Sequence, residues 1–339
     1  MSPMRILIIG GTVFLGRAIV AEAVRRGHQV TTFNRGKSGA DAPGVEAIHG
    51  DRESPADLAR LAEGREWDAV IDVCGYVPRV VGESVRALSG RAATYAFISS
   101  ISAIKGFPAE PVDETSALFD CAPDAGPDDG DYGTLKAGCE RAVEQGFDGN
   151  RLIIQPGLIL GPHENVGRLP WWLTRVERGG RVLAPGTPEV SMQLIDARDI
   201  AVFTLDQAEA GTDDRFLTSG VPDTTTYGGW LAECVRVTGS DAELVWVDDD
   251  FLLAREVKSW TEFPLWVPTT PEMRNVWQMS SAKAAAAGLR CRPIAETVAD
   301  TWAWLREIPA DRREFGTAAV SHGIDPDKEA AILVEWDNR

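Results

Sequence analysis

The sequence predicts an α/β fold, a doubly wound parallel (Rossmann) sheet joined to a smaller mixed α/β lid domain. Apolar runs of four to six residues alternate with longer amphipathic stretches as far as Gly157, which is typical of a parallel sheet covered by helices on both faces. A glycine-rich turn, Gly10 to Gly16, follows the first apolar run, Arg5 to Ile9. After Gly157, proline, glycine and tryptophan become frequent, which indicates a second unit.

The same patterns place the individual elements. The expected strands are Arg5–Ile9, Val30–Phe33, Glu46–His49, Ala69–Val73, Tyr95–Ser99 and Leu152–Gln155. The expected helices are Phe14–Arg26, Pro55–Glu63, Val80–Leu88 and Tyr132–Gln145. These alternating strands and helices predict a doubly wound α/β domain.

The two domains are expected to interleave in the sequence. A strand over 193–199 followed by a helix over 200–208 predicts a return to the first domain. The dinucleotide-binding domain would then comprise residues 1–162 and about 190–210, and the lid about 163–189 and 211–339. Residues 325–336 have a helix start and an amphipathic pattern, so the tail should dock as a helix.

Composition limits the function classes. The chain has 339 residues, of which 44% are hydrophobic and 25% charged, as in ordinary globular proteins. Its net charge of −17 repels phosphate backbones and anionic membranes, which disfavours nucleic-acid and membrane partners. Five cysteines without paired spacing suit reduced thiols in a cytoplasm and form no metal-site pattern. We expect a cytoplasmic protein with a small-molecule substrate and no metal; its oligomeric state stays open.

The glycine-rich turn is a candidate phosphate cradle. Between a strand and a helix, such a turn leaves bare amides at a helix N-terminus, where a pyrophosphate binds well. The spacing fits G-x-x-G-x-x-G with Val13 in place of the middle glycine, so the phosphates would approach less closely there. The candidate contacts are Gly10, Thr12, Val13, Phe14, Leu15 and Gly16.

Residues after the next strands would select the nucleotide. Asn34 and Arg35 follow the second strand, where NAD-selective domains place an acid. Arg35 and Lys37 could pair with a 2′-phosphate, so NADP is the preferred cofactor and NAD the alternative; a solvated basic turn is the competing interpretation. Further candidate cofactor contacts are Asp51 and Arg52 after the third strand and Cys74, Gly75 and Tyr76 after the fourth.

Tyr132 and Lys136 lie four residues apart on an expected helix, so both side chains project from one face. A nearby ammonium lowers the pKa of a phenol, which could then act as acid or base near neutral pH. Ser100 ends the fifth strand and would hold the substrate oxygen, with Ser99 and Ser102 as alternatives. Redox chemistry on an alcohol/carbonyl pair is the leading interpretation.

With these motifs in order, the chain resembles the short-chain dehydrogenase/reductase superfamily in its extended or atypical NAD(P)-dependent epimerase/dehydratase-like branch. The resemblance implies that Ser100, Tyr132 and Lys136 are catalytic. It also implies that the segment from Gln155 to Pro162, with Pro156 and Gly157, passes the nicotinamide. Ser99, Tyr132 and Lys136 would face the cofactor as well. Gln155 stands where many relatives carry arginine.

Three functions remain open at this stage. The main expectation is an NADPH-dependent reductase or dehydrogenase of a small carbonyl or alcohol, and the second is a nucleotide-sugar epimerase with retained NAD. The third is a non-catalytic dinucleotide sensor or an RNA-binding relative. A nucleotide sugar would need cations for its diphosphate, and a basic stretch offers Arg168, Arg175, Arg178 and Arg181. On a helix, however, Arg175 and Arg178 share a face that we expect to be solvent-exposed.

Overall fold

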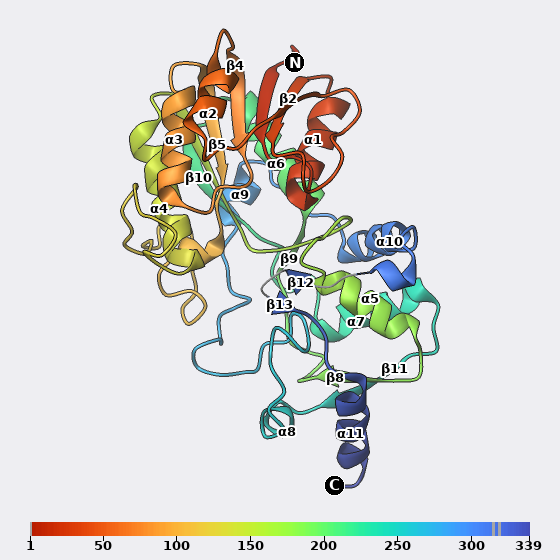
Figure 1. Cartoon of the computed structure of the whole chain (residues 1–339). Helices are drawn as coiled ribbons and strands as arrows, with labels where there is room; N and C mark the ends of the chain where they lie inside the picture. The colour runs from red at the N-terminus through yellow and green to blue at the C-terminus, as the bar shows by residue number, and fades with distance from the viewer. Residues whose placement is uncertain (1, 314–315, 318–319) are drawn as a thin grey trace.

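A parallel sheet with helices on both faces forms one half of the molecule, and helices with short strands form the other (Figure 1). The computed structural model describes residues 2–313, 316–317 and 320–339. The predicted fold class, a doubly wound α/β sheet, is confirmed.

The sheet has seven parallel strands in the order β10-β6-β5-β4-β1-β2-β3. Because β1 lies between β4 and β2, the strand order reverses at β1. Sheets of this kind bind ligands outside the carboxyl ends of the strands at such a point, and we call this edge of the sheet the crevice. The strands are β1 (Arg5–Ile9), β2 (Gln29–Asn34), β3 (Glu46–His49), β4 (Trp67–Asp72), β5 (Ala92–Ile98), β6 (Asn150–Pro156) and β10 (Asp214–Thr218).

Alternation along the strands gives the sheet two apolar faces. Ile6 and Ile8 pack in one core with α1 and α6, whereas Leu7 and Ile9 pack in another with α2, α3 and α4. The helices of this half are α1 (Phe14–Arg25), α2 (Pro55–Ala62), α3 (Pro78–Leu88), α4 (Tyr132–Gly146) and α6 (Ala197–Glu209), with the short 3₁₀ helix η1 (Ile101–Ala103).

All six predicted strands and four predicted helices of the first domain are present, with ends shifted by at most a few residues. The predicted return segment forms β9 (Leu194–Asp196) and α6, but β9 pairs with β7 (Leu158–Leu160) outside the main sheet. The expected boundary near residue 210 is too early. Strand β10 pairs with β6, so the sheet continues to Thr218.

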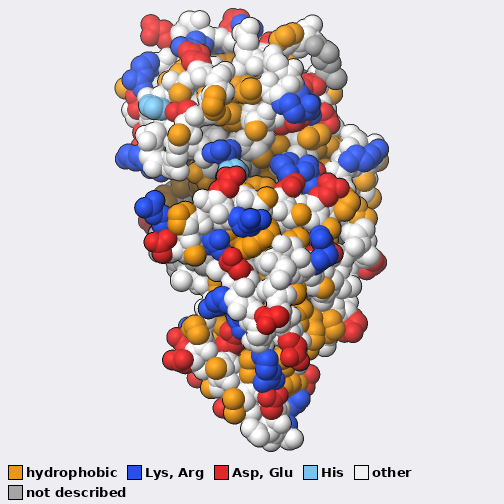
Figure 2. All heavy atoms as spheres, turned by 90° about the vertical axis from the view of Figure 1, so that its right-hand side faces the viewer, with side chains coloured by type: hydrophobic (Ala, Val, Ile, Leu, Met, Phe, Trp, Pro, Cys, Tyr) orange, Lys and Arg blue, Asp and Glu red, His pale blue; other side chains and the backbone are white. Residues whose placement is uncertain are grey.

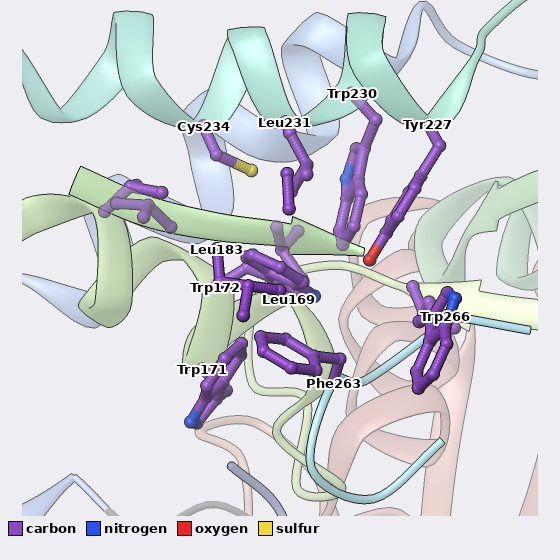
Figure 3. Close-up of a cluster of buried hydrophobic side chains, with 14 of the residues drawn as sticks. Leu169, Trp171, Trp172, Leu183, Tyr227, Trp230, Leu231, Cys234, Phe263 and Trp266 are labelled. Carbon is purple, nitrogen blue, oxygen red and sulfur yellow. The ribbon is translucent and has the colours of Figure 1, made fainter. Parts of the chain in front are cut away.

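The second half packs around its own aromatic core. Trp172 is fully buried; its ring stacks on Phe263 at 5.8 Å and meets Trp171 edge-on at 4.8 Å (Figure 3). Trp266 is also buried, so these tryptophans serve packing. The remaining elements are α5 (Arg168–Glu177), β8 (Arg181–Pro185), α7 (Tyr227–Thr238), β11 (Glu243–Val247), α8 (Asp249–Leu253), α9 (Ala282–Ala286), α10 (Ile294–Leu305), η2 (Ala310–Arg312), β12 (Gly316–Thr317), β13 (Val320–Ser321) and α11 (Pro326–Asp337).

The predicted tail helix is α11, and a buried ion pair fastens it to this half. The Glu329 carboxylate accepts from Arg175 Nε at 2.8 Å and from the Leu183 amide at 3.0 Å. Both charged side chains are at most 10% exposed. Among the described residues, no helix is long and apolar enough to span a bilayer.

Replacing Glu329 should destabilise this half strongly. Glu329→Ala leaves Arg175 buried without its carboxylate, and we expect a loss of about 3–5 kcal/mol in unfolding free energy. Glu335→Ala on the same helix removes an exposed pair with Arg255 and should cost at most about 1 kcal/mol. Urea unfolding followed by tryptophan fluorescence measures both. Equal losses in the two variants would contradict a structural role for the buried pair.

Candidate functional site

The turn between β1 and α1 has the backbone of a phosphate cradle. Gly10 and Gly11 adopt φ of +107° and +101°, a region that favours glycine. A Cβ on Gly16 would lie 2.9 Å from the Gly11 amide nitrogen, so the turn also needs glycine there. Helix α1 begins at Phe14 without a side-chain cap from Val13. Its first amides and its dipole therefore suit a phosphate group.

Helix α4 carries Tyr132 and Lys136 into the crevice. Asp131 caps the helix by accepting from the Thr134 amide at 2.9 Å. Gly133 allows close packing on η1, since a Cβ there would lie 2.2 Å from the Ser102 carbonyl oxygen. The sequence Tyr132-Gly133 thus presses the start of the helix against the end of β5, where Ser100 lies.

Lys136 is buried at the carboxyl edge of the sheet. Its Nζ donates to the carbonyl oxygens of Gly75 at 2.9 Å and Ile98 at 2.7 Å. The rings of Phe97 and Tyr76 flank the ammonium at 4.5 and 5.4 Å from their centroids. Burial lowers the pKa of Lys136 to about 8, although neighbouring acidic groups favour the charged form.

Tyr132 and Ser100 come together as predicted. Tyr132 is 52% exposed, and Ser100 lies close enough to its phenol to oppose the rise of the Tyr132 pKa that burial causes. Ser100 also accepts from the Ser102 amide at 3.1 Å. A half-open phenol beside a held hydroxyl can exchange a proton with a substrate oxygen.

The groups that influence the pKa of Tyr132 include a cation from the lid. Burial raises the pKa of Tyr132 above its ordinary value, and the groups that oppose this rise are Ser100 and Arg168. The Lys136 ammonium itself donates to Gly75 and Ile98. Arg168, the first residue of helix α5, is thus a cation that lowers the pKa of Tyr132. The sequence did not indicate this role for Arg168.

Ser99 is buried next to this site, and its hydroxyl stabilises the fold instead of facing a ligand. Its hydroxyl is hydrogen-bonded to Glu140, a fully buried carboxylate on α4. Gln155 Nε2 donates to the same carboxylate at 2.9 Å, and Arg215 Nη2 lies 3.2 Å from it. Burial raises the pKa of Glu140. Arg215, on β10, therefore supplies the positive charge that Gln155 does not.

Arg52, a predicted cofactor contact, is held by a second buried network. Its two terminal nitrogens bind the Asp72 carboxylate at 2.8 and 2.7 Å, and Tyr95 donates to Asp72 at 2.9 Å. The guanidinium also lies 3.7 Å from Cys74 Sγ. These contacts hold the loop after β3 against β4, so Arg52 positions Asp51 and Cys74.

An acid that the sequence did not suggest lies at the end of β2. The Asp41 carboxylate accepts from Asn34 Nδ2 at 2.8 Å and lies 2.8 Å from His49 Nε2. The loop after β2 folds back to bring it there, seven residues beyond Asn34. Arg35 and Lys37 are exposed on this loop. The end of β2 thus carries both a carboxylate and two cations.

Two further predicted contacts lie at the end of β6. The Gly157 amide donates to the Thr218 carbonyl at 2.8 Å, which joins this bend to β10. A Cβ on Gly157 would lie 3.1 Å from Met279 Sδ. Pro156 ends the strand and is buried. Both residues lie at the carboxyl end of β6, next to the end of β10.

The basic stretch in and after α5 serves packing and ion pairing. Arg175 is buried against Glu329, so its expected solvent exposure is wrong. Arg181 pairs with Asp337 at 2.7 Å. Arg168 Nε binds Glu164 at 3.0 Å and its Nη2 binds the Ile159 carbonyl at 2.9 Å. These contacts leave this stretch little capacity for a diphosphate.

Comparison with known proteins agrees with this geometry. Residues 6–87 match the model of the NAD dependent epimerase/dehydratase family. This match and the shared fold agree with the predicted resemblance to the extended short-chain dehydrogenase/reductase branch. The family match supports the predicted NAD(P)-dependent enzyme.

Individual relatives cover most of the chain at low identity. UDP-glucose 4-epimerase from Thermotoga maritima, solved with UDP-glucose, has a TM-score of 0.69 at 18% identity over 90% of this chain and 99% of its own. The Thermus thermophilus UDP-glucose 4-epimerase complex with NAD gives 0.65 at 17% identity, over 90% of this chain and 100% of its own. These likenesses show the fold.

A curated relative from Arabidopsis thaliana is the chloroplast stem-loop binding protein of 41 kDa b. It is 26% identical over 255 residues, which is 70% of this chain. The chain spans 64% of the length of that relative.

The lowered pKa of Lys136 predicts a distinctive pH dependence of stability. Between about pH 8 and 10.5 the unfolded chain holds this proton more tightly than the folded protein. The contribution of Lys136 to the free energy of unfolding is therefore lowest below pH 8. This contribution should rise by about 3 kcal/mol as the pH increases from about 8 to 10.5. Urea unfolding of the wild type and Lys136→Met across this range measures the difference. Parallel stability curves would show that the lysine is not desolvated.

Proposed function

We propose that this protein is a nicotinamide-dependent epimerase that oxidises a secondary alcohol and reduces the resulting ketone again while it retains NAD. The observation that carries this is the convergence of Ser100, Tyr132 and Lys136 on the crevice beside the glycine cradle. The family match over residues 6–87 and the fold shared with UDP-glucose 4-epimerase over 90% of the chain favour an epimerase over a reductase.

Each residue of the trio has a role that its position supports. Ser100 holds the substrate oxygen, and Tyr132 takes its proton during oxidation and returns it during reduction. Lys136 uses two of its three N–H donors on main-chain carbonyls, which leaves one to hold a ribose hydroxyl. The nicotinamide, when bound, accepts and returns a hydride. The raised pKa of free Tyr132 keeps the phenol protonated until ligands enter.

Asp41 supports NAD as the resident nucleotide. Its carboxylate at the end of β2 can accept from a ribose 2′-hydroxyl, and its charge opposes a 2′-phosphate. Arg35 and Lys37 remain the basis for the NADP alternative. NAD is present in the Thermus thermophilus epimerase structure, which agrees with the choice made from Asp41.

Stem-loop binding, the activity in the name of the Arabidopsis relative, is a second candidate function. The charge of −17 opposes it, because RNA binding requires a basic surface. On the face that carries α1 and α10, acidic and basic side chains are interspersed (Figure 2). The catalytic trio has no use in a purely RNA-binding protein.

Nucleotide analysis and one substitution test the proposed function. Protein purified without added ligand and then denatured should release close to one NAD per chain. Tyr132→Phe should bind NAD normally, yet reduce the bound NAD to NADH with substrate at least 10²-fold more slowly. Ser116→Ala, at a turn outside the crevice, is the control. Undiminished reduction in Tyr132→Phe would refute the proton-transfer role.

Cofactor choice is tested by calorimetry on two variants. Asp41→Ala should weaken NADH binding about tenfold, because a charged hydrogen bond to the ribose is lost, and should leave NADPH binding equal or stronger. Arg35→Ala should change NADH binding little. A larger effect of Arg35→Ala on NADPH, together with tighter NADPH than NADH binding in the wild type, would restore the NADP assignment.

A further inference from the structure

A cavity of about 310 Å³ lies between the glycine-rich turn and the lid. Thr12, Val13 and Phe14 line one side, and Trp304 and Arg312 line the other. The catalytic trio does not line it. The cavity therefore adjoins the phosphate cradle.

Positive charge gathers around this cavity in an otherwise acidic protein. Arg17, Arg312 and Arg313 all line it. Arg313 is already bound to Glu177 at 2.6 Å, and its side chain is only 6% exposed. Within residues 2–313, 316–317 and 320–339, neither Arg17 nor Arg312 forms an ion pair. In a chain with seventeen excess acidic charges, two such arginines facing one cavity call for an anionic ligand.

The other polar groups of the cavity do not cancel this charge. Glu164 is the acidic residue of the lining, and its carboxylate accepts from Arg168 Nε at 3.0 Å and the Leu169 amide at 3.2 Å. Burial and the nearby Arg17 lower the pKa of His163, so this ring is neutral at pH 7 and can donate a hydrogen bond.

We propose that Arg17 and Arg312 hold the diphosphate of the bound dinucleotide, Arg17 from the first turns of helix α1 and Arg312 from the lid. This inference rests on the proposed function. Val13 occupies the place where a glycine would let the phosphates approach the backbone closely, and two guanidinium groups that line the cavity offset that loss. A nucleotide-sugar diphosphate has the same chemistry. The dinucleotide is favoured because the cavity borders Thr12, Val13 and Phe14, and not Tyr132.

A consequence is that the nucleotide joins the two halves of the molecule. Arg17 belongs to α1 on the sheet, whereas Arg312 ends η2, which follows α10 in the lid. Cofactor binding would then draw the lid to the cradle and close the crevice over Tyr132.

Calorimetry with ADP-ribose, adenosine and UDP tests this clamp. Arg17→Ala and Arg312→Ala should each weaken ADP-ribose binding about tenfold and reduce its salt dependence, while adenosine binding stays unchanged. Arg306→Ala, an exposed arginine at the end of α10 that does not line the cavity, is the matched control and should bind as the wild type does. Thermal unfolding confirms that each variant is folded.

The outcomes separate the two proposals. If the wild type binds ADP-ribose and both variants bind it equally well, the clamp is wrong and the proposed function stands. If the variants lose UDP binding and keep ADP-ribose binding, the cations serve a substrate diphosphate and the assignment to the dinucleotide is overturned. If the wild type binds neither NAD nor ADP-ribose, the proposed function itself fails.

Discussion

The burial of one ammonium group organises the site. Lys136 Nζ is held by the carbonyls of Gly75, in the loop after β4, and of Ile98, the last residue of the neighbouring strand β5. A buried lysine is tolerated only where such acceptors satisfy it. Those two bonds therefore fix α4 against the crevice, and the position of α4 determines where Tyr132 meets Ser100. The glycine at position 133 permits this approach, because any larger residue would collide with η1.

Near Lys136, two buried carboxylates are neutralised by arginines from other elements of the sheet. Arg215 on β10 neutralises Glu140 beside Gln155, and Arg52 on the loop after β3 neutralises Asp72 at the end of β4. Asp41 reaches the end of β2 from within a loop. In each pair the partners are distant in the sequence or separated by a turn, so the crevice is held together by contacts that span several strands.

The sequence predicts well what local periodicity controls. Strands such as Arg5–Ile9 and helices such as Pro55–Ala62 follow from apolar spacing and caps, and Tyr132 with Lys136 follows from helical geometry. Strand β10 was not predicted, because its five residues are too few to show a clear alternation of apolar and polar side chains. Asp41 and Arg168 escaped because their relevance depends on how a loop and the lid fold back. Arg175 was misjudged because its partner, Glu329, lies 154 residues away.

The most direct test of this account is a crystal structure of the protein with NAD. The account predicts the pyrophosphate at the start of α1 and the reactive face of the nicotinamide beside Tyr132 and Ser100, with one ribose hydroxyl accepting from Lys136. A nucleotide bound elsewhere, or a nicotinamide turned away from Tyr132, would contradict the central claim that this crevice carries out hydride and proton transfer.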